Sequence, residues 1–153
     1  DLRRGDLVNT CKYGPVPVTH IGRRVIKHMA SEERIKDQLY VGPQSAFPEA
    51  TEDLVVTGCH SLLLLGDFRS EEEKQRTAEV LGGIYVTDER YRFPACVLEE
   101  TQVYPVKGTF YVYHFSLEHE DPRMNYAVLA NNIVVESASN RHMTELDILT
   151  LID

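Results

Sequence analysis

Apolar residues in this chain recur in short runs that alternate with polar residues, and helical spacing is rare. Such alternation predicts β-strands, because successive side chains of a strand point to opposite faces. Gly, Pro and Asn, which favour turns, separate the runs, and Gly22 is read here as one such break. The number and spacing of the runs predict a meandering, mainly antiparallel all-β domain. The predicted strands cover residues 6–12, 16–21, 24–29, 38–41, 54–57, 61–65, 109–117, 126–130 and 133–136.

Two late segments give the clearest β patterns. Residues 109–117 (TFYVYHFSL) carry bulky side chains at both odd and even positions, which predicts a strand covered on both faces. Asn131-Asn132 lies between two apolar runs. A two-residue hairpin turn needs positive φ at both positions, and Asn adopts positive φ more readily than most residues. A tight hairpin is therefore predicted there.

One segment interrupts the strand pattern with a predicted helix. Ser70 and Glu73 form a capping box, three glutamates occupy the first turn, and the helix is expected to run to Leu81 and stop at Gly82-Gly83. Its apolar stripe is thin, so we expect a short inserted surface helix. Residues 144–152 fit a short capped helix or a strand, and Thr144-x-x-Asp147 favours a short C-terminal helix.

Composition limits the function classes. The chain has 153 residues, of which 42% are hydrophobic and 26% charged, and we expect one soluble domain over residues 1–153. Its 16 Lys and Arg against 24 Asp and Glu give a net charge of −8, which argues against nucleic acid and anionic membranes as partners. No apolar run is long enough for a membrane span. Because the chain does not begin with Met, we expect it to be part of a longer polypeptide.

The three cysteines, Cys11, Cys59 and Cys96, are widely spaced. An odd count without dense spacing argues against a disulfide scaffold and favours buried reduced thiols, although one pair with one free thiol stays open. Zinc ligands usually come as two close pairs, whereas Cys59 and His60 are adjacent in sequence. We therefore expect no metal site.

The best candidate for chemistry is Thr57-Gly58-Cys59-His60, a turn between two apolar runs. A Thr hydroxyl and a His ring at this spacing can hydrogen-bond one peptide nitrogen, polarise that peptide and protonate its leaving amine. The alternative is a strand-end His60 that is satisfied by a backbone carbonyl. Cys59 is a poor nucleophile for His60, because neighbours on a strand point to opposite sides. Among the other histidines, His114 is expected in the core, whereas the rest are expected to be solvated: His20, His28, His119 and His142.

Several segments together resemble the Hint family, the self-processing domain of inteins and hedgehog proteins. The chain contains Gly-Asp-x-Val-x-Thr at 5–10, Pro-Val-x-x-Ile-Gly-Arg-Arg at 17–24, Thr-x-x-His at 57–60 and apolar closing runs up to residue 137. These motifs occur in order, and the match is closest to bacterial-type Hint domains. The resemblance implies a horseshoe-shaped β fold.

The resemblance also implies an activity. Family members use an N-terminal Cys or Ser to attack the preceding carbonyl, an N-to-S or N-to-O acyl shift that releases an upstream segment. Thr57 and His60 carry over as the pair that distorts and protonates the scissile amide. No metal or organic cofactor is implied. The implied partner is the upstream segment of the same polypeptide, with a downstream segment and a larger assembly as alternatives.

The sequence departs from the family at two places. No Cys or Ser precedes Gly5, so the nucleophile is not among these residues, and Asn140-Arg141-His142 does not match the closing His-Asn of inteins. Complete splicing is therefore not expected. Two alternatives stay open: a catalytically silent Hint-fold structural module, and an unrelated β-domain that binds a partner.

Overall fold

The computed structural model describes residues 1–145 and 149–152 and shows a mainly antiparallel β protein with two short helices. The fold class expected from the hydrophobic pattern is confirmed. In chain order the elements are β1 Leu7–Thr10, β2 Gly14–His28, β3 Leu39–Gly42, β4 Leu54–Thr57, β5 Ser61–Leu64, α1 Glu71–Leu81, β6 Val86–Thr87, β7 Arg90–Pro94, β8 Gln102–Val103, β9 Gly108–Leu117, β10 Ala127–Ala130, β11 Ile133–Glu136, α2 Asn140–Glu145 and β12 Thr150–Ile152.

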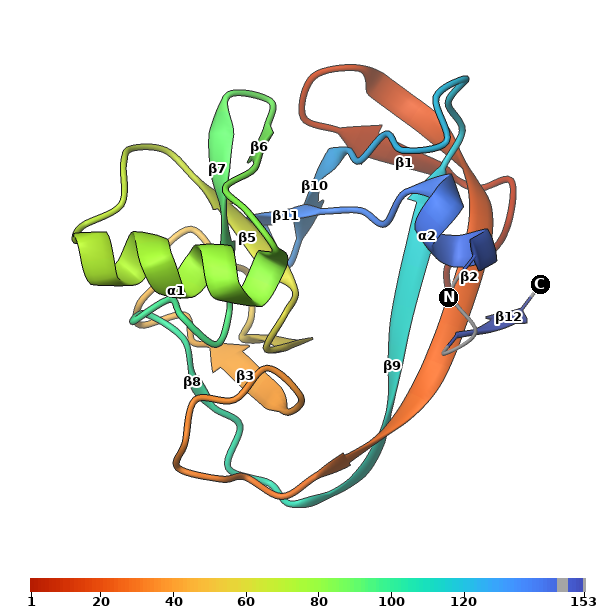
Figure 1. Ribbon diagram of the computed structural model, residues 1–153. Helices are drawn as coiled ribbons and strands as arrows, with labels where there is room; N and C mark the ends of the chain where they lie inside the picture. The colour runs from red at the N-terminus through yellow and green to blue at the C-terminus, as the bar shows by residue number, and fades with distance from the viewer. Residues whose placement is uncertain (146–148, 153) are drawn as a thin grey trace.

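The strands form two sheets. The larger sheet has the order β12-β2-β1-β10-β11-β5-β7-β6, and β9 pairs with β2 outside this path. The smaller sheet has the order β4-β3-β8. In Figure 1 the long strands β2 and β9 curve together along one side of the molecule, and the smaller sheet and α1 lie on the other side. No helix within the described residues is both long and apolar enough to cross a membrane.

Strand β2 is continuous, so the prediction of two strands separated at Gly22 is wrong. The strand changes partner along its length: its first residues pair with β1, up to Leu7 opposite Pro17, and Val18 onward pairs with β9. Gly22 lies inside the second part. A Cβ there would lie 2.9 Å from the terminal methyl of Met143 and 3.2 Å from Leu149 Cβ. Glycine is needed at this position for close packing and forms no turn.

Strand β9 spans the predicted segment, but the prediction that both of its faces are covered is wrong. Tyr111 and Tyr113 are 56% and 58% exposed on its outer face. The guanidinium of Arg23 lies over the Tyr111 ring at 4.8 Å, a cation–π contact at the surface. The bulky residues on this face therefore lie against solvent and a neighbouring arginine.

The predicted hairpin is confirmed. Asn131 and Asn132 have φ values of 49° and 64°, and Ala130 pairs with Ile133 on either side of them. Both side-chain amides also donate hydrogen bonds to the preceding loop, Asn131 to the carbonyl of Asp53 and Asn132 to the carbonyl of Glu49. The turn thus fixes β10 and β11 and anchors the loop that leads into β4.

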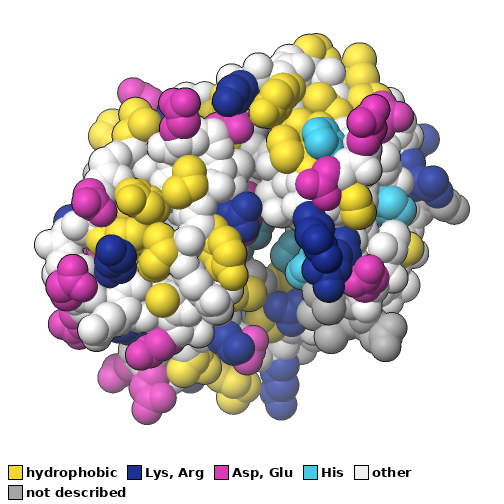
Figure 2. All heavy atoms as spheres, turned by 45° about the horizontal axis from the view of Figure 1, so that its top comes forward, with side chains coloured by type: hydrophobic (Ala, Val, Ile, Leu, Met, Phe, Trp, Pro, Cys, Tyr) yellow, Lys and Arg dark blue, Asp and Glu magenta, His cyan; other side chains and the backbone are white. Residues whose placement is uncertain are grey.

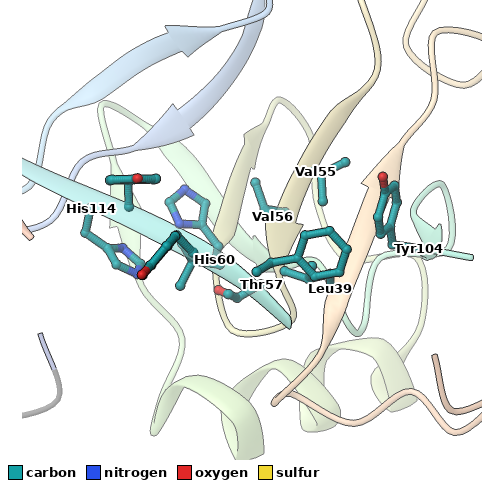
Figure 3. Close-up of a pocket in the computed structure, with 11 residues that line it drawn as sticks. Leu39, Val55, Val56, Thr57, His60, Tyr104 and His114 are labelled. Atoms are coloured by element: carbon teal, nitrogen blue, oxygen red, sulfur yellow. The ribbon is translucent and has the colours of Figure 1, made fainter. Parts of the chain in front are cut away.

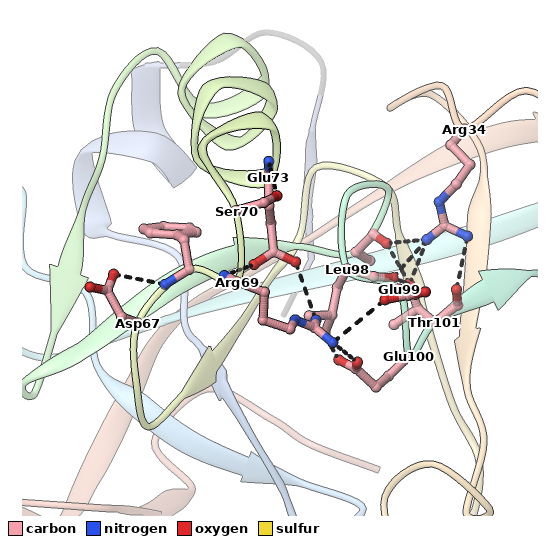
Figure 4. Close-up of polar contacts among 11 residues, drawn as sticks. Arg34, Asp67, Arg69, Ser70, Glu73, Leu98, Glu99, Glu100 and Thr101 are labelled. Carbon is pink, nitrogen blue, oxygen red and sulfur yellow. Dashed lines mark hydrogen bonds and ion pairs between the residues drawn. The ribbon is translucent and has the colours of Figure 1, made fainter.

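Helix α1 begins and ends where its sequence signals predict. The Ser70 hydroxyl accepts from the Glu73 amide at 3.1 Å, and Gly82 ends the helix with a φ of 81°. The second half of the capping box differs, because the Glu73 carboxylate accepts from the amide of Arg69, one residue before Ser70 (Figure 4). The Arg69 side chain also pairs with Glu73 and Glu100.

The C-terminal region differs from its prediction. Helix α2 lies earlier, at Asn140–Glu145, whereas Thr150–Ile152 forms β12 and pairs with β2. The helix expected for residues 144–152 is therefore wrong for its last part, and Asp147 lies outside the described residues. Strand β12 forms because Leu151 comes opposite Gly22, on the edge of β2 that β9 leaves open.

Two polar side chains tie distant segments together. His28 is buried: its Nε2 donates to the Tyr104 carbonyl at 2.6 Å, and its Nδ1 accepts from the Leu39 amide at 3.1 Å. The expectation that His28 is solvated is wrong. Arg34 donates to carbonyls of the segment that follows β7 (Figure 4), namely those of Ala95, Cys96, Leu98 and Thr101.

Candidate functional site

Thr57 and His60 occupy the two ends of a tight turn between β4 and β5. The His60 amide donates to the Thr57 carbonyl at 3.0 Å, and the Gly58 amide donates to the Gln38 carbonyl at 2.9 Å. A Cβ on Gly58 would lie 2.6 Å from the Lys36 carbonyl oxygen, so only glycine fits here. The turn is held by backbone bonds and close packing, which fixes Thr57 relative to His60.

Both residues face a hollow between the two sides of the molecule. They line a cavity of about 400 Å³ toward the smaller sheet and a second cavity of about 260 Å³ toward α2. Figure 3 shows Thr57 and His60 toward one end of the larger cavity and Tyr104 at the other. Figure 2 shows this hollow at the centre of one face, with histidine side chains inside it.

The polar groups of Thr57 and His60 keep free hydrogen-bonding capacity. Thr57 Oγ1 contacts the Sγ of Cys59 at 3.8 Å, a weak interaction. Within residues 1–145 and 149–152, no group forms a hydrogen bond with the His60 ring, and no backbone carbonyl satisfies it as the structural alternative would require. His28, by contrast, uses both ring nitrogens. The His60 ring is therefore available to a bound group.

Three histidines gather at the site. The ring centroids of His60 and His114 are 6.1 Å apart, and those of His114 and His142 are 6.0 Å apart. His114 comes from β9 and His142 from α2, and both line the 260 Å³ cavity. His142 is exposed, as predicted, whereas His114 is half-buried and not in the core. Their approach to His60 was not predicted, because the three residues lie far apart in the sequence. The alternation of side chains along β9 defines two faces of the strand. It does not predict which of these faces the curved strand turns toward Thr57.

Desolvation keeps two of these histidines, His60 and His114, neutral. Desolvation lowers the pKa of His60 from 6.5 to about 4. The pKa of His114 also falls to about 4, first through desolvation and then through the positive charges that His60, His142 and Arg24 would carry. Both rings are consequently neutral at pH 7, and each offers one N–H donor and one nitrogen acceptor.

An ion pair lies at the far side of the smaller cavity. Arg92 Nε lies 3.0 Å from Glu136 Oε2, and both residues line the 260 Å³ cavity with His60. Burial raises the pKa of the Glu136 carboxyl, and the positive charge of Arg92 offsets part of this rise. This pair was not predicted, because residue 92 meets residue 136 only through the sheet order β11-β5-β7.

All three cysteines are free thiols. Cys96 is buried, as expected, and Cys59 is half-buried beside Thr57. Cys11 is exposed, so the expectation of buried thiols is wrong for that residue. Across the part of the chain that the structure describes, no group of three or more His, Cys, Asp or Glu side chains has the geometry to hold a metal ion.

Comparison with protein-family models, with curated proteins and with solved structures finds no match to this chain. The likeness to Hint domains therefore rests on the sequence motifs. Residues 5–10 contain β1, residues 17–24 lie in β2, and residues 57–60 span the turn from β4 to β5. Of these three segments, only residues 57–60 contribute to the lining of the two cavities.

Proposed function

We propose that this chain is a Hint-type autoprocessing domain, in which an N-to-S or N-to-O acyl shift releases an upstream segment of the same polypeptide. The nucleophile, a Cys or Ser, would lie outside the 153 residues. The observation that carries the proposal is the unsatisfied pair at the cavity: the Thr57 hydroxyl and the His60 ring are fixed in one turn and have free hydrogen-bonding groups.

The proposed reaction begins at the nucleophile's side chain. Its sulfur or oxygen attacks the carbonyl carbon of the preceding residue, and its proton passes to the neutral His60 ring. The carbon–nitrogen bond then breaks, and the same proton passes to the leaving amine. The products are a thioester or ester and a free α-amine. No metal and no electron transfer are needed to balance this step.

The low pKa of His60 suits this order of events. A neutral imidazole can accept the nucleophile's proton at pH 7, and the imidazolium so formed is a strong acid in its buried setting. The Thr57 hydroxyl can donate to the scissile peptide and support its distortion. His114, at a ring distance of 6.1 Å, adds a second neutral imidazole beside His60.

Cleavage is favoured over splicing. The closing Asn of an intein needs a free side-chain amide to cyclise, but Asn140 is engaged within the fold. Its Nδ2 donates to the Leu117 carbonyl at 3.0 Å, and its Oδ1 accepts from the Thr19 hydroxyl. We therefore propose that water or another external nucleophile resolves the thioester or ester.

The test uses the longer polypeptide with its upstream residues in place. Hydroxylamine or a thiol should release the upstream fragment, which gel electrophoresis and mass spectrometry detect at the predicted junction. His60→Ala should abolish release, and Thr57→Ala should slow it by about 10²-fold, the scale for a group that assists proton transfer. His119→Ala is the matched control, because His119 is exposed and lies in the loop after β9.

Two results would oppose the proposal. Precursor that stays intact with hydroxylamine and with thiol would leave the silent structural module as the better explanation. Release that is equal in wild type and His60→Ala would show that the turn takes no part in the chemistry.

A further inference from the structure

The larger cavity is a groove with an apolar floor and no charged lining. The floor is one face of the smaller sheet, where Leu39, Val55 and Thr57 lie beside Tyr104. None of the described residues that line the groove is Lys, Arg, Asp or Glu. Burying a charge in such a setting is costly, so the groove selects an uncharged occupant.

The wall of the groove is an open strand edge. Five consecutive residues of β9, 110–114, line it, which a strand allows only along its edge because alternate side chains point to opposite faces. Strand β9 pairs with β2 on its other side. Its second edge faces the groove.

The direction of the backbone groups on β9 follows from one hydrogen bond. The Phe115 carbonyl accepts from the Ala138 amide at 3.0 Å, so the backbone of Phe115 points away from β2. Backbone direction alternates along an antiparallel strand, so the N–H and C=O groups of Tyr113 and Tyr111 also point away from β2. Among the described residues, no hydrogen bond reaches the amides or carbonyls of Tyr111 and Tyr113 on this side.

The chain itself begins to fill this edge. Ala138 forms a parallel bridge with Ser116, beyond which residues 139–145 turn away into α2. The edge accepts an extended segment at Phe115 and stays open at Tyr113 and Tyr111. Unpaired strand edges are templates for a further strand, and here the edge is recessed inside a groove.

We propose that an extended, uncharged segment of the same polypeptide, the one that carries the scissile peptide bond, binds in this groove as a strand added to β9. This inference rests on the proposed function. It adds that the substrate segment binds in an extended conformation. Backbone bonds to Tyr111 and Tyr113 hold the segment, and side chains on one face pack over Leu39 and Val55. The groove passes Thr57 and His60 before it reaches His114 at the end away from Tyr104, so the added strand brings a peptide bond to that pair.

The test tethers a probe to the full chain. The probe is a short peptide of alternating Val and Thr, joined to residue 1 by a flexible Gly-Ser linker that raises its effective concentration to about millimolar. Amide hydrogen exchange, followed by NMR, should slow at least about tenfold at Tyr111 and Tyr113. The same peptide with every backbone nitrogen methylated keeps its side chains but has both edges blocked against strand pairing, so it should give no protection.

A pair of variants locates the binding. Val55→Asp places a charge on the groove floor, and Val25→Asp places one on β2 outside the groove; both valines are substantially exposed, at 41% and 57%. Val55→Asp should remove the protection, and Val25→Asp should leave it unchanged. Equal protection from the methylated and unmethylated peptides, or protection that survives Val55→Asp, would overturn the inference.

The experiment separates this inference from the proposed function. His60→Ala should keep the protection at Tyr111 and Tyr113, because binding needs no chemistry, yet should lose cleavage of the precursor. Protection without cleavage in the wild-type precursor would keep the groove and reject the acyl shift. Cleavage without protection would keep the acyl shift and reject binding in the groove.

Discussion

His60 and His28 show what separates a structural histidine from an available one. His28 is buried and donates and accepts through its two ring nitrogens, whereas His60 is half-buried and its ring has no hydrogen bond from the described residues. The half-buried His60 ring lines both cavities, so its nitrogens can bond to a group that enters them.

The buried imidazoles make stability depend on pH. Between pH 6.5 and about 4, the unfolded chain binds protons at residues 60 and 114 that the folded chain does not, so the free energy of unfolding falls as pH falls through this range. One pKa unit corresponds to about 1.4 kcal/mol. His60→Ala should reduce this pH-dependent loss by roughly 1–3 kcal/mol, measured by urea unfolding at pH 7 and pH 4.5.

The exposed His119 supplies the control for this measurement. His119→Ala should keep the wild-type difference between the two pH values, because its ring lies in the loop after β9 at the surface. An identical pH dependence in His60→Ala and wild type would show that the imidazole of residue 60 titrates normally, and would remove the basis for its role as a neutral base.

At the scale of elements, the turn between β4 and β5 is the least tolerant part of the site. A Cβ on Gly58 would meet two backbone carbonyl oxygens, at 2.6 Å and 2.9 Å, which cannot move without breaking the loop that carries them. Gly58→Ala should therefore lower the free energy of unfolding by about 3 kcal/mol, at the upper end for overpacking. Gly22→Ala should cost about 1 kcal/mol, because its nearest clash is with the flexible end of Met143. Urea unfolding of both variants compares them, and equal costs would contradict this reading.

The hairpin between β10 and β11 gives a second prediction at this scale. In Asn131→Ala, alanine must adopt the φ of 49° that asparagine tolerates more readily. The variant also loses the hydrogen bond to the Asp53 carbonyl. The cost should be about 1–2 kcal/mol. Asn131→Gly loses the same bond without the backbone strain, so thermal unfolding should place it between Asn131→Ala and wild type. An Asn131→Gly variant less stable than Asn131→Ala would refute the strain argument.

These elements also show which features a sequence can predict. The Asn131-Asn132 turn and the α1 caps depend on neighbours in the chain, and both were predicted correctly. Gly22 was misread as a break because its reason, the approach of Met143 and Leu149, comes from distant residues. The same holds for the site: Thr57 and His60 are three residues apart and were found, whereas His114 and His142 reach it only through the fold.

At the scale of the whole molecule, one side chain joins the two sheets. His28 ends β2 of the larger sheet, and its ring binds Leu39 of β3 and Tyr104 beyond β8, in and beside the smaller sheet. Leu39 and Tyr104 both line the groove. The two hydrogen bonds of His28 therefore set the distance between the groove floor and the β9 edge. This distance is the width available to a bound strand.

Replacement of His28 should consequently act at a distance on the site. His28→Phe fills the space but leaves the Leu39 amide and the Tyr104 carbonyl unpaired, which should lower the free energy of unfolding by about 2–4 kcal/mol. Amide exchange at Leu39 should accelerate, and cleavage of the precursor should slow even under conditions where the variant is fully folded. Met29→Ala, at the exposed neighbouring residue, should change neither. Wild-type cleavage in folded His28→Phe would show that the sheets hold their spacing without this joint, through the core packing and the bonds of Arg34.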